Sequence, residues 1–265
     1  MVLAGKTALL TGATGGLGRA IARALADRGA GLVLSSRKPD ELAELAAGLP
    51  GADHRTLACD LAEEGAALRL LAEAGDVDVL VANAGLPASG RLEGFSQEEI
   101  GRALRVNLES PVRMARELAP RLVQRGSGQL VFLSSISGKA ATARASLYAA
   151  TKFGVRGFAL CLREDLRGTG VGVSVISPGA IRAAGMFADS GAGPPPLIGT
   201  GTPEQVAGAV VRAIEHDRSE ITVAPLRQRA LSRIAINAPE LSGRIAGEMA
   251  TRVADEIARG QTDKR

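Results

Sequence analysis

The sequence predicts an α/β fold in which a single domain is built on a doubly wound, mostly parallel sheet of seven strands. Seven short apolar runs, bounded by turn residues, alternate with segments of helical periodicity almost to the end of the chain. The runs are apolar throughout, which is typical of parallel strands covered by helices on both faces. With 27.1 kDa and 46% hydrophobic residues, the chain can bury a full core. The runs are Thr7–Leu10, Leu32–Leu34, Thr56–Cys59, Val77–Ala82, Leu130–Leu133, Val171–Ile176 and Ile221–Val223.

Helical patterns occupy the segments between these strands. The longest expected helix has Ser96 as its N-cap, and another has Thr202 as its cap and a proline in its first position. Both arrangements are strong start signals. The expected helices are Arg19–Arg28, Glu41–Ala47, Gln97–Arg125, Ser146–Arg167 and Pro203–His216.

The composition gives little support to a protein that binds nucleic acid or metal or that spans a membrane. The net charge is only +4, and basic residues are interspersed with acidic ones. Cys59 and Cys161 lie in apparent strand and helix patterns without a CxxC pair or a histidine cluster, which predicts reduced, buried thiols and no metal site. No apolar run approaches the roughly 18 residues that cross a bilayer. We expect a cytoplasmic protein with no nucleic-acid partner and no membrane association.

A glycine-rich loop follows the first expected strand and precedes a helix. Glycines let a backbone approach a pyrophosphate closely, and the free N–H groups of a helix N-terminus favour an anion. The spacing alone also fits a tight turn without a ligand, so other residues must decide between the two interpretations. The loop consists of Thr11, Gly12, Ala13, Thr14, Gly15, Gly16, Leu17 and Gly18.

The only tyrosine of the chain, Tyr148, lies four residues before Lys152, and the chain has no tryptophan. At this spacing the two side chains share one face of a helix. A nearby ammonium stabilises a phenolate, so Lys152 is expected to lower the pKa of Tyr148 and make it an acid for carbonyl reduction. Taken singly, the pair is also a common helix-surface pair, Ser135 fits a strand-end cap, and Asn107 fits a bend in a helix.

In combination these residues resemble the short-chain dehydrogenase/reductase family. The loop from Thr11 to Gly18 matches its glycine signature, and Ala82-Asn83-Ala84-Gly85 resembles its N-N-A-G element except at the first position. Asn107, Ser135, Tyr148 and Lys152 match its catalytic set, and Ser177-Pro178-Gly179 resembles its P-G turn. The resemblance spans about residues 5 to 225 and implies a Rossmann-fold oxidoreductase that uses a nicotinamide dinucleotide.

The resemblance also implies a role for each matching residue. Tyr148 would be the acid, Ser135 would bond the substrate oxygen, Asn107 would hold a water, and Lys152 would bond the nicotinamide ribose. Backbone groups of Ile181 would hold the nicotinamide amide, where Ala183 replaces a threonine common in the family. The implied cofactor-binding residues are Thr11, Gly12, Thr14, Gly15, Gly16, Leu17, Gly18, Ser36, Arg37, Asp60, Leu61, Asn83, Ala84, Gly85, Tyr148, Lys152, Pro178, Gly179 and Ile181.

The end of the second strand favours NADP(H) over NAD(H). An acidic residue there would bond the ribose 2′-hydroxyl and repel a 2′-phosphate, but the chain has Ser36, Arg37 and Lys38. Arg37 is therefore the expected phosphate contact and Ser36 a second one. Arg37 and Lys38 also fit ordinary solvated charges. Asp60, expected in the adenine pocket with Leu61, fits a helix N-cap equally well.

The segment Ala183–Gly201 is rich in glycine, proline and alanine and is long for a connection, which predicts a lid over the substrate. Its Met186 and Phe187, together with Ser137, are the expected substrate contacts. The apolar lid favours a hydrophobic carbonyl or secondary alcohol. A 3-oxoacyl carrier-protein reductase is one alternative, and a dinucleotide-binding sensor without catalysis is another.

The expected domain covers residues 1–225, and residues 226–265 form a helical C-terminal extension. Such an extension resembles the hydroxysteroid-dehydrogenase-like branch of the family. The extension carries an apolar stripe that fits packing on the domain or a neighbouring subunit better than a lipid surface, because acidic residues interrupt its basic face. By resemblance, the helices Gln97–Arg125 and Ser146–Arg167 would pair in a homodimer or homotetramer. The stripe consists of Leu241, Ile245, Met249, Val253 and Ile257.

Overall fold

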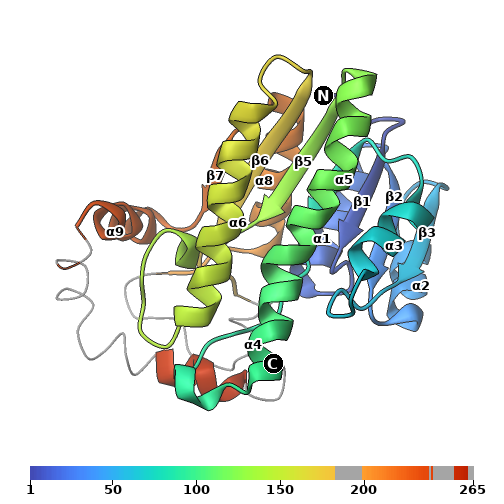
Figure 1. Cartoon of the computed structure of the whole chain (residues 1–265). Coiled ribbons are helices and arrows are strands. Elements are labelled where there is room, and N and C mark those ends of the chain that lie inside the picture. Colours follow the sequence, from blue (N-terminus) through green and yellow to red (C-terminus); the bar gives the residue numbers. More distant parts are fainter. Residues whose placement is uncertain (183–198, 239, 241–253, 262–265) are drawn as a thin grey trace.

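The computed structural model describes residues 1–182, 199–238, 240 and 254–261, and it contains one seven-stranded parallel sheet (Figure 1). The strand order is β3-β2-β1-β4-β5-β6-β7, so the chain reverses its direction of winding at β1. This confirms the predicted doubly wound α/β fold. The strands are β1 (Thr7–Thr11), β2 (Gly31–Ser36), β3 (His54–Ala58), β4 (Val79–Ala82), β5 (Gly128–Leu133), β6 (Val171–Pro178) and β7 (Glu220–Val223).

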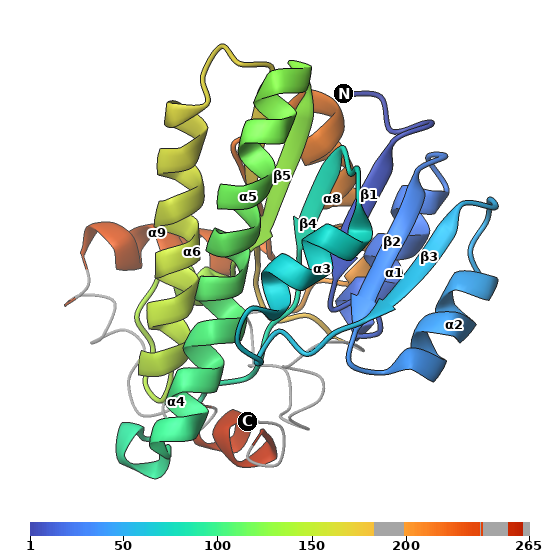
Figure 2. The same ribbon diagram turned by 45° about the vertical axis from the view of Figure 1, so that its right-hand side comes forward.

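Helices cover both faces of the sheet, as Figures 1 and 2 show from two directions. Leu10 of β1 packs in one hydrophobic cluster with α1 (Gly16–Ala26), α2 (Pro39–Ala47) and α8 (Pro203–His216). Its neighbour Leu9 points to the opposite face, in a second cluster with α3 (Ala66–Ala74), α5 (Ser110–Arg125) and α6 (Ser146–Asp165). Both leucines have no exposed surface, which explains why the strand sequences do not alternate.

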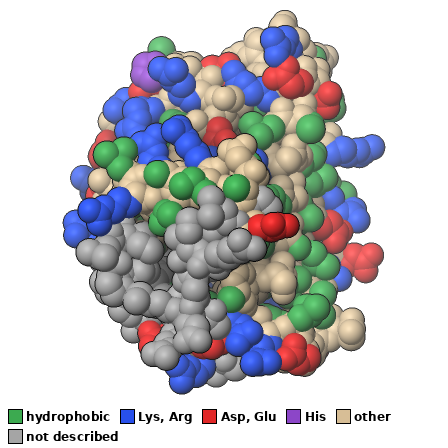
Figure 3. Space-filling model, turned by 90° about the vertical axis from the view of Figure 1, so that its left-hand side faces the viewer, with side chains coloured by type: hydrophobic (Ala, Val, Ile, Leu, Met, Phe, Trp, Pro, Cys, Tyr) green, Lys and Arg blue, Asp and Glu red, His purple; other side chains and the backbone are tan. Residues whose placement is uncertain are grey.

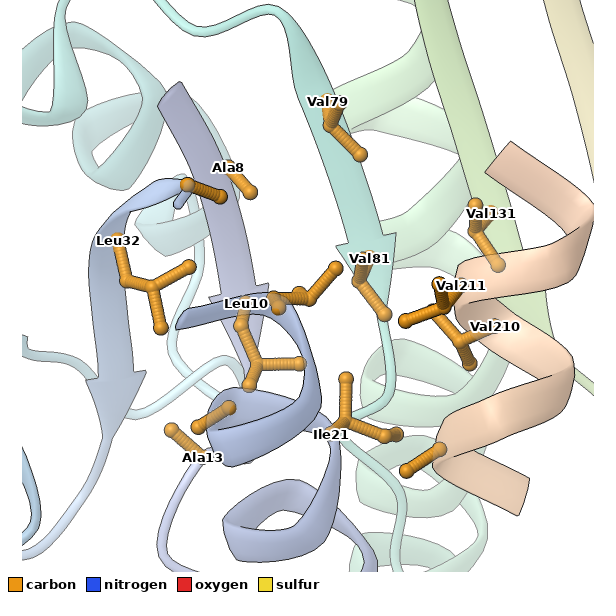
Figure 4. Close-up of a cluster of buried hydrophobic side chains, with 14 of the residues drawn as sticks. Ala8, Leu10, Ala13, Ile21, Leu32, Val79, Val81, Val131, Val210 and Val211 are labelled. Atoms are coloured by element: carbon orange, nitrogen blue, oxygen red, sulfur yellow. The ribbon is translucent and has the colours of Figure 1, made fainter. Parts of the chain in front are cut away.

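The first cluster shows how α1 and α8 pack on the sheet. Leu10, Ile21 of α1 and Val210 of α8 have no exposed surface and lie together in Figure 4. Full burial of a side chain of this size stabilises the fold by roughly 1.5–3 kcal/mol. The N-terminus of α1, which the glycine loop precedes, is therefore fixed against the end of β1.

The expected single helix Gln97–Arg125 is interrupted. It consists of α4 (Gln97–Leu104), a π-helical turn at Arg105–Glu109 and α5. Pro111 has no amide hydrogen for the carbonyl four residues earlier, that of Asn107, and this accounts for the wider turn at that point. The predicted caps are confirmed, since Ser96 and Thr202 each form a capping box.

Two further predictions differ from the structure. The sequence interpretation gave no helix between β3 and β4, where α3 lies. The thiol of Cys161 is exposed and that of Cys59 is only half-buried, so the prediction of two buried thiols is wrong. Cys161 lies on the solvent side of α6, because Val155 and Ala159 form the buried face of that helix.

The residues after β7 include α9 (Leu226–Asn237) and a short helix at 254–260. On α9 the exposed residues include Leu226, Leu231 and Ile234. Figure 3 views this side of the molecule, where Lys and Arg side chains lie next to hydrophobic ones. Of the predicted apolar stripe only Ile257 belongs to the described residues. Among them, no helix has the length and hydropathy needed to cross a membrane.

Candidate active site

Most of the predicted site residues lie at the carboxyl ends of the strands, which is where parallel α/β sheets bind ligands. Thr11 ends β1, and Asn83 follows β4 directly. Ser135 lies two residues beyond β5, and Pro178 ends β6. Tyr148 and Lys152 reach the same edge from the first two turns of α6.

Thr11 and Asn83 connect the glycine loop to the end of β4. The buried Thr11 hydroxyl oxygen accepts hydrogen bonds of 3.1 Å from the backbone N–H groups of Asn83 and Ala84. In return, the Asn83 side-chain amide donates to the carbonyls of Thr11 at 3.0 Å and Gly12 at 3.1 Å. These hydrogen bonds fix the glycine loop to the end of β4 and engage the Thr11 hydroxyl and the Asn83 side-chain amide.

Three glycines of the loop differ in how strictly the surrounding structure requires a residue without a side chain. Gly12 has φ +65°, and a Cβ there would approach the Cα of Ala84 to 2.8 Å. A Cβ on Gly18 would lie 2.1 Å from the Gly12 carbonyl oxygen, so this glycine lets α1 pack against the loop. Gly15 is exposed, and a Cβ there would meet only the Gly12 oxygen, at 3.4 Å. Space inside the protein therefore does not require a glycine at position 15.

The loop and the N-terminus of α1 fit a phosphate group. Gly15 is the N-cap of α1, and within the described residues no side chain caps the helix and no acidic residue lies in its first turn. The first N–H groups and the positive end of the helix dipole are therefore available to an anion. The backbone from Gly12 to Gly18 could hold the pyrophosphate of a dinucleotide.

Arg37 and Asp60, which are predicted to contact the adenosine part of the cofactor, lie beyond the ends of β2 and β3. The Arg37 side chain is half exposed, and its guanidinium is 4.0 Å from the Asp60 carboxylate. Asp60 also accepts a 2.9 Å hydrogen bond from the backbone N–H of Ala62, which closes a turn. Lys38 differs from Arg37, because it pairs with Glu41 at 2.6 Å. Ser36 accepts a hydrogen bond from the Lys38 backbone N–H at 3.1 Å.

Ser135, Tyr148 and Lys152 are brought together by the structure. The hydroxyl of Ser135 lies close enough to the phenol of Tyr148 to influence its pKa. The Lys152 Nζ lies 5.7 Å from the centre of the tyrosine ring and donates a 2.9 Å hydrogen bond to the Leu133 carbonyl. Lys152 is only 4% exposed. Ser137 is half-buried beside this group, and its backbone N–H donates to the Ser135 oxygen at 3.1 Å.

The pKa values of this pair differ from the expectation. Burial raises the pKa of Tyr148 to about 12, although the Ser135 hydroxyl acts in the lowering direction. Burial also lowers the pKa of Lys152 to about 8. The expected lowering of the tyrosine pKa is therefore wrong for the cofactor-free protein, because the loss of water around the phenol outweighs the favourable contacts.

Asn107 lies in the π-helical turn and is 1% exposed. Its side chain pairs with the backbone of Leu86, accepting from the N–H at 2.7 Å and donating to the carbonyl at 3.0 Å. It is also 3.4 Å from the hydroxyl of Thr151, which donates to the Tyr148 carbonyl at 2.8 Å. Asn107 thus connects the segment after β4 to the helix of Tyr148.

The P-G turn lies next to β7, since the N–H of Gly179 donates to the Val223 carbonyl at 2.9 Å. Ile181 is buried and forms a β-bridge with Gly201. The predicted substrate contacts Met186 and Phe187 lie outside the described residues, as does most of the predicted lid.

Two supporting residues of the site were missed by the sequence interpretation. Ser134 is buried and donates a 2.8 Å hydrogen bond to the carbonyl of Lys152. A Cβ on Gly138 would lie 2.5 Å from the same carbonyl oxygen, so the loop after Ser135 packs directly on α6. The Ser134-Ser135 pair was a visible signal, but its two members face different partners.

The family model described as short chain dehydrogenase matches residues 6–194, which include the glycine loop and the residues Ser135, Tyr148 and Lys152. The chain belongs to the short-chain dehydrogenase family. It is 38% identical over 227 residues to the ketoacyl reductase HetN of Nostoc, an alignment that covers 83% of this chain and 79% of that protein. As a short-chain dehydrogenase, the protein is an oxidoreductase that acts on alcohol or ketone groups.

Two solved structures that resemble this one are complexes with dinucleotides. A serine dehydrogenase in its closed form, complexed with NADP⁺, has a TM-score of 0.74 and 29% identity and covers 83% of this chain and 95% of its own. A 3-ketoacyl-(acyl-carrier-protein) reductase from Brucella melitensis, complexed with NADH, has a TM-score of 0.76 and 25% identity, with coverages of 85% and 99%.

Proposed function

We propose that this short-chain dehydrogenase transfers a hydride between NADP(H) and a hydrophobic carbonyl compound or secondary alcohol. The observation that carries the proposal is the grouping of Ser135, Tyr148 and Lys152, in which the Ser135 hydroxyl acts on the Tyr148 phenol and the Lys152 Nζ lies 5.7 Å from the centre of the ring. This group lies at the same edge of the sheet as a loop that fits a pyrophosphate. When bound, the dinucleotide supplies or accepts the hydride. The protein must then orient the substrate and deliver or remove one proton.

Tyr148 and Ser135 would act on the same substrate oxygen. In the reductive direction, the Tyr148 hydroxyl gives its proton to the oxygen as negative charge develops there. Ser135 donates a hydrogen bond to that oxygen and stabilises the charge. The phenol is protonated at neutral pH and can give a proton, although a pKa of about 12 makes it a weaker acid than a free phenol. The phenolate that remains is stabilised by the Lys152 ammonium, which is present below a pH of about 8.

The preference for NADP(H) rests on Arg37. No carboxylate ends β2, and the Arg37 side chain is half exposed and contacts Asp60 only at 4.0 Å. A 2′-phosphate could replace that weak contact with a charge-assisted hydrogen bond. The serine dehydrogenase complexed with NADP⁺ is compatible with this choice, whereas the Brucella reductase is complexed with NADH. Arg37 is therefore the residue on which the preference depends.

A second candidate function is reduction of a 3-oxoacyl carrier-protein thioester. The likeness to HetN and to the Brucella reductase favours it, because both are described as ketoacyl reductases. The two functions share the same chemistry at Tyr148 and differ in the substrate. We also propose a homo-oligomer, because Phe153 of α6 is 43% exposed, which is unusual for so large an apolar side chain.

The test is turnover of purified protein with NADPH or NADH against a panel of aliphatic ketones, aromatic ketones and a 3-oxoacyl thioester. Tyr148→Phe should lose at least about 100-fold in kcat, because general acid catalysis contributes about that much, while NADPH binding persists. Binding of NADPH without turnover of any compound would favour a non-catalytic sensor. Size-exclusion chromatography with light scattering tests the oligomer, and a monomer would contradict it.

A further inference from the structure

A group of charged residues lies beside the catalytic segment without belonging to it. The carboxylate of Glu220, at the start of β7, receives the Arg156 guanidinium at 2.8 and 3.1 Å and the Lys139 ammonium at 2.9 Å. The hydroxyl of Ser177 donates to the same carboxylate at 3.2 Å. One carboxylate thus binds three side chains that come from three different parts of the chain.

Two of these partners lie close in the chain to the proposed catalytic residues. Lys139 lies four residues after Ser135, on the loop that also carries Ser137. Arg156 lies one turn beyond Lys152 on α6, on the same helical side. Glu220 therefore connects the loop of Ser135 to the helix of Tyr148 and Lys152.

The charged side chains of Lys139 and Glu220 are largely buried. The Lys139 side chain is 10% exposed and that of Glu220 is 18% exposed. The Lys139 ammonium also donates a 2.7 Å hydrogen bond to the Thr222 hydroxyl, so its position is fixed by two partners on β7. Burial alone would raise the pKa of the Glu220 carboxyl, but hydrogen bonds from Arg156 and Lys139 lower it, and the group is an anion at neutral pH. A buried ammonium without its counter-ion is costly.

We propose that Glu220 is a positioning residue that holds the Ser135 loop at working distance from Tyr148 through Lys139 and Arg156. This inference rests on the proposed function, since it concerns the geometry of the same proton transfer. The close packing of Gly138 against the Lys152 carbonyl leaves the loop little room toward α6. The ion pairs prevent it from moving away from α6. Proton transfer and oxyanion stabilisation are sensitive to displacements of about 1 Å.

The experiment compares Glu220→Gln with a matched control, Asp217→Asn. Asp217 also binds an arginine of α6, Arg163, at 2.7 and 2.8 Å, but this pair does not touch the Ser135 loop. Glu220→Gln should lower kcat about tenfold with KM for NADPH unchanged, whereas Asp217→Asn should leave kcat within about twofold of the wild type. Lys139→Gln removes the ion pair between Lys139 and Glu220 from the loop side and should lower kcat by a similar factor. This variant provides the test if Glu220→Gln folds poorly.

Two readouts separate positioning from general stability. Amide hydrogen exchange in residues 134–140 should rise in Glu220→Gln and Lys139→Gln but not in Asp217→Asn. In a Ser135→Ala background, Glu220→Gln should lower kcat less than about twofold, because the residue through which it acts is gone. Unchanged exchange in that segment, or equal losses of kcat in both backgrounds, would overturn the inference. A wild type without any turnover would overturn the proposed function, and the exchange comparison would still decide whether Glu220 holds the loop.

Discussion

The hydroxyl of Ser134 donates a hydrogen bond of 2.8 Å to the backbone carbonyl of Lys152. The residue before the proposed catalytic serine is therefore bound to the backbone of the proposed catalytic lysine. Both residues are buried, with 5% and 4% of their surfaces exposed. The contact sets the distance between the end of β5 and α6 at the point where the proposed reaction takes place.

Ser134→Ala removes this bond and should lower both stability and kcat. We expect a loss of about 1 kcal/mol in the free energy of unfolding, typical of one buried hydrogen bond, and a decrease in kcat of several fold. The control is Ser174→Ala in β6, where a fully buried serine accepts a 2.8 Å hydrogen bond from Gln129 away from the site. The control should lose stability and keep kcat. Equal kcat losses in both variants would contradict the positional role of Ser134.

Gly15→Ala should separate cofactor binding from folding. The backbone of Gly15 is in the extended region at φ −67°, and an added Cβ meets no protein atom closer than 3.4 Å. Stability should change by less than about 1 kcal/mol. The methyl group would occupy space beside the proposed pyrophosphate, so the Kd for NADPH should rise at least about tenfold. Denaturant unfolding and NADPH fluorescence titration measure the two quantities.

Gly18→Ala and Gly101→Ala are the controls for Gly15→Ala, the first with an expected loss of stability and the second without one. A Cβ on Gly18 would lie 2.1 Å from a backbone oxygen, so this variant should lose several kcal/mol of stability as well as binding. Gly101 in α4 has no atom within 4 Å of a Cβ position, and alanine there should be neutral or slightly stabilising. Normal NADPH binding by Gly15→Ala would show that the loop does not approach a phosphate there.

Arg37→Gln should weaken NADPH binding about tenfold and leave NADH binding nearly unchanged. The expected loss corresponds to about 1.4 kcal/mol, within the range of one charge-assisted hydrogen bond. Lys38→Gln is the control, because Lys38 pairs with Glu41 at 2.6 Å. It should change neither Kd by more than about twofold. Tighter binding of NADH than of NADPH by the wild type would overturn the proposed preference at once.

The buried Lys152 gives the cofactor-free protein a specific pH dependence of stability. Its pKa is lowered from 10.5 to about 8 by burial. Between these values the unfolded state binds more protons than the folded state, so the free energy of unfolding should rise as pH increases from about 8. The measurement is the free energy of unfolding of wild type and of Lys152→Met between pH 7 and 9.5. The difference between the two proteins isolates Lys152, because the contributions of the other titrating groups largely cancel. The difference should shift in favour of the wild type with rising pH, and a shift in the opposite direction would contradict the lowered pKa.

The single tyrosine makes the ionisation of the proposed acid directly visible. A free phenol is about half ionised at pH 10, whereas a pKa of about 12 leaves only about one per cent ionised. Near-ultraviolet absorbance of the folded, cofactor-free protein at pH 10 should therefore show almost no phenolate. The same protein in denaturant should show about half. Equal phenolate signals in the two states would mean that Tyr148 is not shielded from water.

The strands of the sheet, and the order of the proposed site residues along the chain, could be predicted from the sequence. Apolar runs predicted every strand, although β3 begins earlier, at His54, because the first residues of this edge strand are polar and largely exposed. The helix α3 was not predicted, since Gly65 at its N-cap has φ +70° and offers no capping side chain. Pro111, which accounts for the π-helical turn, was visible within the expected long helix, but the pairing of Asn107 in that turn with Leu86 depends on the tertiary fold.

Features that depend on burial, or on contacts between residues far apart in the chain, could not be predicted from the sequence. The sign of the Tyr148 pKa shift follows from how much water surrounds the phenol, which spacing to Lys152 does not reveal. The contact of Lys139 with Glu220 joins a loop to an edge strand far away in the chain, and neither residue belongs to a motif. Such partners are set by the tertiary fold.

The strand order places the two ends of the proposed cofactor site on opposite sides of β1. Arg37 and Asp60 follow β2 and β3, whereas Ser135 and the P-G turn follow β5 and β6. No hydrogen bond or ion pair in the described part of the chain joins Arg37 to the proposed catalytic residues. In the proposed mechanism, cofactor preference and carbonyl chemistry therefore depend on separate groups of residues. We therefore expect that substitutions at the end of β2 can exchange one coenzyme for the other without changes to the proposed proton donor.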